Sequence, residues 1–261
     1  MNSQNSNKMP ALFIGHGSPL LIQESNAFTP EWEKIAKTFF RPKAIIVISA
    51  HWVRDQREIT ANKNQKQIFD FYGFPEELYK TKYSVAGKPE LAEEIVKILP
   101  NSKLAECWGL DHGAWCVLYK MYPEQDIPVI EISLQKNDSP KKLIKLGEQL
   151  KYLRDQGVLI VLSGNMVHNL RTVDFSGKAR TPTWANEFEE TIHDLIVAKD
   201  QQGVIDFVTK SELTSMAHPS LEHLFPVFLI LGLAEQNEKI NSFNRAFDLG
   251  TISMTCFSVG L

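Results

Sequence analysis

The sequence contains few cysteines and no pair of them at redox or metal-binding spacing. Three occur among 261 residues, Cys107, Cys116 and Cys256. An odd number without a C-x-x-C pair argues against a disulfide framework and favours a reducing compartment. We therefore expect a cytoplasmic protein.

Long apolar runs and a strong charge of one sign are also missing. No stretch approaches the roughly 20 apolar residues of a membrane span. The polar first ten residues lack the apolar centre of a signal peptide, and we expect residues 1–9 to form a flexible tail. The formal net charge is only -3, so no basic surface is expected for nucleic acid. Membranes and nucleic acids are therefore not the predicted partners.

What the sequence does contain is an alternation of apolar runs and amphipathic runs, which predicts an α/β fold. The apolar runs lack polar alternation, as expected for strands covered on both faces. They are residues 11–14, 44–49, 129–134 and 158–163. Each predicted helix opens at a proline; the helices span residues 29–40, 89–99, 140–157 and 182–199. Residues 251–259 alternate and predict an edge or antiparallel strand.

The positions of the histidines are more informative than their number. His16 and His51 each come two residues after an apolar run, and His168 follows a third run closely. In open α/β sheets, ligands bind outside the carboxyl ends of the strands. One histidine at a strand end is most often structural, but three at strand ends favour a shared metal site. Gly15 and Gly17 would allow a tight turn around His16.

A fourth candidate segment lies at residues 218–226. Pro226 fits without a kink only in the first turn of a helix, which places His223 at or just before the helix start. Adjacent helical residues diverge by about 100°, so only one of Glu222 and His223 can face the metal. Glu222 would complete the carboxylate triad of iron oxygenases. His223 would give three histidines, which also suit zinc.

The remaining histidines and aromatic residues allow two interpretations each. His193 lies within a predicted helix and is interpreted as a surface or packing residue, and His218 as the N-cap of a helix. Asp111 is a candidate helix cap, and the neighbouring His112 could face the site. The aromatic segment 69–75 is either core or pocket lining, while Trp52 would give the pocket an apolar wall.

Six ordered motifs resemble the LigB-type class III extradiol ring-cleavage dioxygenases, and within them the 4,5-DOPA extradiol dioxygenase family. Five of them are ALFIGHGSP from Ala11, SAHW from Ser49, DFYGFP from Asp70, DHGAW from Asp111 and SGNMVHNLR from Ser163. The sixth is the Glu222-His223 pair. The match runs in order from about Pro10 to the C-terminus, so the set is specific although each motif alone is weak.

The resemblance implies one catalytic domain over residues 10–261, a three-layer α/β/α domain with a mostly parallel or mixed sheet. The metal site would lie at the carboxyl ends of the strands. One mononuclear divalent metal is implied, with Fe(II) expected for activity and Zn(II) able to occupy the purified protein. The ligands would be His16, His51 and His223.

The resemblance also implies roles around the metal. His168 would be a further ligand or the catalytic acid/base, and His112 a second catalytic residue. The residues expected to bind substrate are Trp52, Phe71, Tyr72 and Asn165. The implied reactants are a DOPA-like catechol and O2, and the protein is expected to be a monomer or small homo-oligomer. A zinc hydrolase-like enzyme and a non-catalytic metal-binding protein on the same scaffold are the alternatives.

Overall fold

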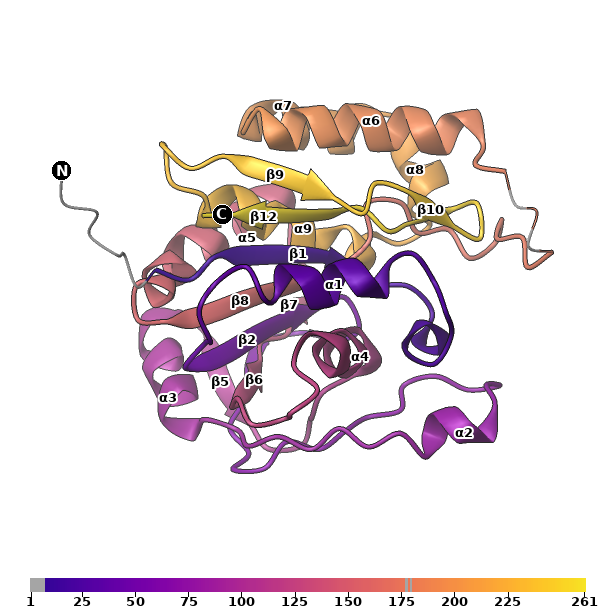
Figure 1. The fold of residues 1–261 in the computed structure, drawn as a ribbon. Helices are drawn as coiled ribbons and strands as arrows, with labels where there is room; N and C mark the ends of the chain where they lie inside the picture. The colour runs from indigo at the N-terminus through magenta and orange to yellow at the C-terminus, as the bar shows by residue number, and fades with distance from the viewer. Residues whose placement is uncertain (1–7, 177, 179) are drawn as a thin grey trace, which may run out of the picture.

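The apolar runs of the sequence form the centre of one mixed sheet (Figure 1). The computed structural model describes residues 8–176, 178 and 180–261. The sheet has the order β6-β2-β8-β1-β12-β9. The parallel strands are β1 (Ala11–Gly15), β2 (Ala44–Ser49), β6 (Val129–Glu131) and β8 (Val158–Gly164). β12 (Cys256–Val259) pairs antiparallel with both β1 and β9 (Ile240–Phe243). The antiparallel strand predicted over 251–259 is therefore confirmed only for its second half, because Ile252–Ser253 form a separate strand, β11, outside this sheet.

Helices cover both faces of this sheet, so the predicted three-layer architecture is confirmed. α1 (Thr29–Ile35) and α4 (His112–Met121) lie in front of the sheet in Figure 1. Leu12 and Ile14 of β1 belong to the core cluster of this face. The next residue along the strand, Phe13, belongs to the other core cluster, since alternate side chains point to opposite faces. The helices packed there are α3 (Pro89–Ile98), α5 (Pro140–Leu150), α6 (Thr183–Val197) and α9 (Phe225–Leu233).

The remaining elements complete the fold around the central sheet. The helical ones are η1 (Pro19–Ile22), α2 (Glu76–Tyr79), η2 (Lys151–Arg154), α7 (Gln201–Lys210), α8 (Leu213–Ala217) and η3 (Leu221–His223). The strands are β3 (Val53–Arg54), β4 (Arg57–Thr60), β5 (Ser102–Ala105), β7 (Leu134–Gln135), β10 (Phe247–Asp248) and β11 (Ile252–Ser253). They pair as β3-β7, β4-β5 and β10-β11.

Several element boundaries differ from the sequence prediction. The helix predicted over 140–157 ends at Leu150 and is followed by η2 (Lys151–Arg154), and the one predicted over 182–199 spans Thr183–Val197. The helix at Thr29 ends at Ile35 instead of Phe40, and its first N–H groups are capped by the Asn26 side chain rather than by Thr29. The strand predicted over 129–134 is divided at Glu131. Beyond it the chain changes partner, because the Leu134 N–H donates to the carbonyl of Trp52.

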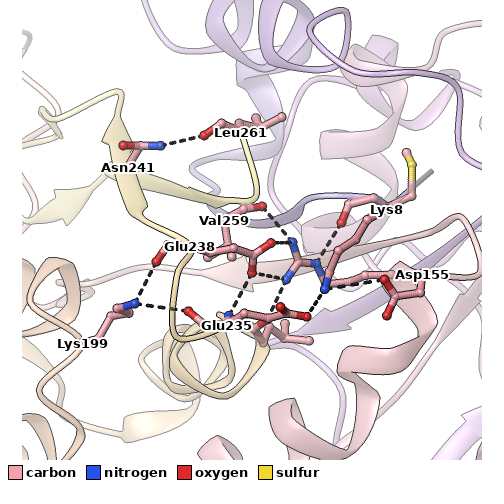
Figure 2. Close-up of polar contacts among 11 residues, drawn as sticks. Lys8, Asp155, Lys199, Glu235, Glu238, Asn241, Val259 and Leu261 are labelled. Carbon is pink, nitrogen blue, oxygen red and sulfur yellow. Dashed lines mark hydrogen bonds and ion pairs between the residues drawn. The ribbon is translucent and has the colours of Figure 1, made fainter. Parts of the chain in front are cut away.

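The amino end of the sheet is closed by a buried arginine, Arg154. Its guanidinium donates five hydrogen bonds, to both carboxylate oxygens of Glu238 and to the carbonyls of Met9, Leu233 and Val259. Figure 2 shows the surrounding ring of polar residues, in which Lys8 pairs with Glu235 and Asp155. We call Arg154, Glu238 and these three carbonyls the arginine clamp.

The predicted flexible tail, residues 1–9, is described only at its end. Residues 1–7 lie outside the described residues. Met9 is fully buried, and its N–H donates to the Arg154 carbonyl at 2.8 Å. Among the helices that the structure describes, none combines the length and apolarity that crossing a membrane requires.

Candidate metal centre

Three histidines from distant parts of the chain converge at the carboxyl end of the sheet. His16 directly follows β1, His51 comes two residues after β2, and His223 ends η3 just ahead of α9. One ring nitrogen from each lies within 4.8 Å of the others, and the Nε2 atoms of His16 and His51 are 3.0 Å apart. β1 and β2 both run parallel to β8, so the turns carrying His16 and His51 lie at one edge.

The geometry distinguishes between the two adjacent candidates at the helix start. The His223 ring is buried and belongs to the group of three. The Glu222 side chain is 32% exposed and accepts a hydrogen bond from the Ser220 hydroxyl at 2.8 Å. The arrangement therefore favours three histidine ligands over a carboxylate triad.

Two glycines allow this close approach. A Cβ at Gly164 would collide with the carbonyl oxygen of His223, and one at Gly113 would lie 2.7 Å from the Ser49 hydroxyl oxygen. Only glycine therefore permits the chain to pass so near the histidines at these positions.

His16 is oriented by a serine that the sequence interpretation did not single out. The Ser163 hydroxyl donates to the Gly113 carbonyl at 2.6 Å, and its oxygen lies 2.9 Å from Nδ1 of His16. Because the one hydroxyl hydrogen is already donated, Nδ1 of His16 must carry the proton. Nε2 of His16 is then a free lone pair directed at the centre, as metal binding requires.

Asn165 fixes the backbone of two of the three histidines. Its side-chain amide donates to the carbonyls of His16 and Ser253, and its backbone N–H donates to the His223 carbonyl at 2.8 Å. This residue is fully buried. Asn165 therefore holds the frame of the site together.

The carboxylate of Asp70 contacts two histidines, His51 of the group of three and the neighbouring His112. Its Oδ2 lies 2.9 Å from Nδ1 of His112 and 3.3 Å from Nδ1 of His51, while Oδ1 accepts the backbone N–H of His112. Burial raises the pKa of Asp70, but the hydrogen bond and charge of His112 outweigh it and lower the pKa overall. Asp70 thus favours the Nδ1–H tautomer of both rings, with Nε2 left as a lone pair.

His168 stacks against a member of the group of three without joining it. Its ring lies parallel to that of His223, with centroids 3.5 Å apart and an interplanar angle of 4°. Burial lowers the pKa of His168 to about 4. His168 is therefore a neutral base beside the centre at pH 7.

Burial, reinforced by the neighbouring histidines, lowers the pKa values of His16, His51 and His223 well below their ordinary range. Both ring nitrogens of His223 are buried without a hydrogen-bond partner among the described residues. Buried polar atoms are rarely left unpaired. Three neutral imidazoles with converging nitrogens therefore fit a divalent cation, which is what such lone pairs bind.

The residues predicted to bind substrate occupy different depths. Phe71 is half-buried, with its ring edge-on to that of His112 at 5.6 Å. Tyr72 is 92% exposed. Trp52 is fully buried and stacks on Trp108 with centroids 5.6 Å apart. The structure thus brings Phe71 to the site and places Trp52 behind it.

Neither of the two histidines set aside from the sequence belongs to this group of three. His193 is buried and hydrogen bonds to the Ser242 hydroxyl at 2.9 Å, so it is a packing residue. His218 follows the end of α8 and is buried, with Nε2 2.8 Å from the Met166 carbonyl. The prediction that His218 caps a helix start is therefore wrong.

The fold and the site agree with the comparison to protein families. The model of the catalytic LigB subunit of aromatic ring-opening dioxygenase matches residues 11–257. The chain belongs to this family, and by enzyme class it is an extradiol ring-cleavage dioxygenase.

Individual relatives are similar over almost the whole chain. The 4,5-DOPA dioxygenase extradiol of Escherichia coli K12 is 37% identical over 98% of this chain and 96% of that protein. The protein of the same name from Beta vulgaris is 36% identical over 97% of each. A crystal structure of an uncharacterized Escherichia coli K12 protein superposes with a TM-score of 0.86 at 34% identity, covering 97% of this chain and all of the other.

Proposed function

We propose that the protein opens the ring of a DOPA-like catechol with O2, using one divalent metal held by His16, His51 and His223. The observation that carries this proposal is the set of three buried, neutral imidazoles whose nitrogens converge. The relatives named for 4,5-DOPA support the substrate class.

We propose that the metal of the active enzyme is iron. When bound, Fe(II) would lower the pKa of the catechol hydroxyls and supply the one-electron chemistry that O2 requires, whereas zinc supplies only the former. Three protein nitrogens on one side of a metal leave other positions for small molecules. Purified protein is expected to carry zinc in some preparations.

Two histidines are placed to move the catechol protons. The Asp70 carboxylate pairs with Nδ1 of His112, so Nε2 of His112 would be the acceptor. Burial lowers the pKa of His168 to about 4, so His168 is unprotonated at pH 7. We propose that one accepts a hydroxyl proton from the substrate and returns it later in the reaction.

Aromatic side chains on segment 69–75 are proposed to position the substrate ring. Phe71 would form an apolar wall because it already packs against His112. Tyr72, on the exposed side of the same segment, would cover the ring. Trp52 and Asn165 are fully buried, so we propose that they support the His51 and His16 turns rather than contact substrate. A cytoplasmic location and a monomer or small homo-oligomer remain predictions.

An oxygen electrode with L-DOPA tests the proposal. Metal-free protein reloaded anaerobically with Fe(II) should consume one O2 per ring opened, and the Zn(II) form should consume none. Activity with zinc and none with iron would contradict the dioxygenase and favour the hydrolase-like alternative. Metal bound without any turnover would favour the non-catalytic alternative.

The role of His168 is separated from ligation by one variant. His168→Ala should lower turnover strongly while metal content stays near one per chain, because the ring stacks on a ligand instead of joining the group. Loss of metal from His168→Ala would make it a ligand, and unchanged turnover would remove it from the mechanism.

A further inference from the structure

A pair of buried acidic side chains lies behind the metal centre and has no part in the proposed chemistry. Glu131 ends β6 and Asp111 caps α4, and both are fully buried. Both carboxyl oxygens of Glu131 and Oδ2 of Asp111 lack any N–H or O–H partner among the described residues if both groups are ionised. Glu131 is the register partner of Val47 on β2, so its side chain points to the same face of the sheet as that of Ser49, two residues further on, whose hydroxyl donates to Asp111. This geometry brings the two carboxyl groups within hydrogen-bonding reach of each other.

Two ionised carboxylates cannot share such a place, since burial and mutual repulsion both disfavour the charges. At least one proton must lie between them. Asp111 is the ionised partner because its Oδ1 accepts hydrogen bonds from the Ser49 hydroxyl at 2.7 Å and the Ala114 N–H at 3.2 Å. Glu131 has no comparable donors, so the proton belongs to Glu131.

The first turn of α4, which this pair holds, supports two of the proposed metal ligands. Ser49 donates to Asp111 and accepts the His51 N–H at 3.2 Å. On the neighbouring strand, Ser163 donates to the Gly113 carbonyl and orients His16. Ser49 and Ser163 are register partners on β2 and β8, so one helix start sets both ligand turns.

We propose that Glu131 is a neutral carboxylic acid in the folded protein, and that its O–H donates to Asp111 to position the first turn of α4 beneath His51 and His16. Glu131 and Asp111 are then positioning residues, and this role rests on the metal site of the proposed function. The Glu131 carboxyl acts as an uncharged donor, which a glutamine amide can replace.

The charges around Glu131 agree with this assignment. Burial, with the negative charge of Asp111 and then that of Asp70, raises the pKa of Glu131 well above its ordinary value. In the unfolded chain the same carboxyl loses its proton near pH 4.3. Folded-state stability therefore falls as pH rises from that value toward the raised pKa, because the unfolded state releases a proton that the folded state keeps.

Three variants of metal-free protein test the proposal, measured by thermal unfolding between pH 5 and pH 8 and by Co²⁺ titration followed by absorption. Glu131→Gln should bind Co²⁺ within about twofold of the parent, since it keeps the donor. Its melting temperature should exceed that of the parent by about 2–4 °C or more at pH 8, with the difference shrinking toward pH 5. Glu131→Met should weaken Co²⁺ binding about tenfold or more, because Asp111 loses its donor. Glu190→Gln, on the exposed side of α6, should change neither.

The proposal is overturned if Glu131→Gln loses as much Co²⁺ affinity as Glu131→Met, or melts below the parent at pH 8. Either result would mean that the carboxylate charge is required. If Glu131→Met does not fold, the Glu131→Gln comparison still decides. Neither readout uses a catechol, so a failure of the ring-cleavage proposal would be seen separately in the oxygen trace.

Discussion

Both ends of the central sheet contain buried polar groups, but these groups are hydrogen-bonded at the amino end and partly without hydrogen bonds at the carboxyl end. At the amino end, the arginine clamp matches all five guanidinium donors of Arg154 with acceptors. At the carboxyl end, neither ring nitrogen of His223 has a hydrogen bond among the described residues, and Nδ1 has only the Glu222 carboxylate nearby, at 3.4 Å. Nε2 of His16 lies 3.0 Å from Nε2 of His51. Satisfied buried polar groups stabilise a fold, whereas unsatisfied ones disfavour it unless a ligand completes them.

This difference assigns stability to one end and binding to the other. Changes at the clamp should alter unfolding without altering the metal centre. Changes among the histidines should alter metal binding with little effect on the metal-free fold. The predictions below test that separation.

Removing a ligand should have the largest effect. His51→Ala should lower metal affinity by about a thousandfold or more, because two histidines remain where catalytic zinc sites have three protein ligands. The metal-free protein should melt at the parent temperature or above it, since one desolvated ring is removed. Metal content after dialysis and a melting curve measure both, and His193→Ala is the matched histidine control.

Removing the clamp should have the converse effect. Arg154→Leu should lower the free energy of unfolding by about 3–5 kcal/mol, because the partly buried Glu238 and the buried carbonyls of Met9, Leu233 and Val259 all lose their donor. Urea unfolding of metal-free protein measures the loss. Metal affinity of the folded fraction should remain within about twofold of the parent, and a large fall in affinity would show that the two ends are coupled.

Replacing the Asp70 carboxylate, which His51 and His112 share, should weaken metal binding without changing the arginine clamp. Asp70→Asn should weaken metal binding about 10- to 100-fold, as is usual when the residue that orients a metal-bound histidine is changed. The amide offers one acceptor oxygen, whereas Asp70 accepts from both the ring and the backbone of His112 and its charge lies 3.3 Å from Nδ1 of His51. Co²⁺ titration measures the change, with the exposed Asp55→Asn as control.

Acidification should remove the stability contributions of the two ends of the sheet in different pH ranges. Burial lowers the pKa values of His168 and His218 to about 4, so the unfolded chain binds their protons first. Stability of metal-free protein should fall on acidification from about pH 6.5 toward pH 4, by about 3 kcal/mol per histidine.

The clamp should respond only at lower pH. Burial raises the pKa of Glu238, but its bonds to Arg154 outweigh burial and lower the pKa overall. Its contribution is present above the ordinary glutamate range, near pH 4.3, and is lost as pH falls through the lower folded value. Unfolding curves from pH 7 to pH 3 should show both windows for the parent, and the lower one should vanish in Arg154→Leu.

His193→Ala should have the smallest effect. The ring hydrogen bonds to Ser242 away from the centre, so its loss should cost about 1 kcal/mol of unfolding free energy. Oxygen uptake per folded molecule should match the parent. A tenfold fall in turnover would show that His193 contributes to catalysis, and would contradict the separation between stabilising residues and residues of the metal centre.

The sequence was sufficient to predict the central strands and two of the three proposed metal ligands. Both boundaries of strand β2 agree with the prediction because its residues are apolar on both faces. His16 and His51 are predictable as ligand candidates because sites in such sheets lie at the carboxyl ends of the strands. The choice between Glu222 and His223 required the geometry of the short turn before α9. Asp70, Ser163 and Glu131 were not identified because their contacts join distant segments, separated by 42 residues for Asp70 and His112 and by 147 for Ser163 and His16.

The position of a bound metal tests the central claim most directly. Anomalous diffraction from crystals grown with Zn²⁺ should give one strong peak about 2.0–2.1 Å from a ring nitrogen of each of His16, His51 and His223. A second group of nearby donors, His51, Asp70 and His112, offers the alternative. A peak among those three residues, with His223 left unliganded, would contradict the account.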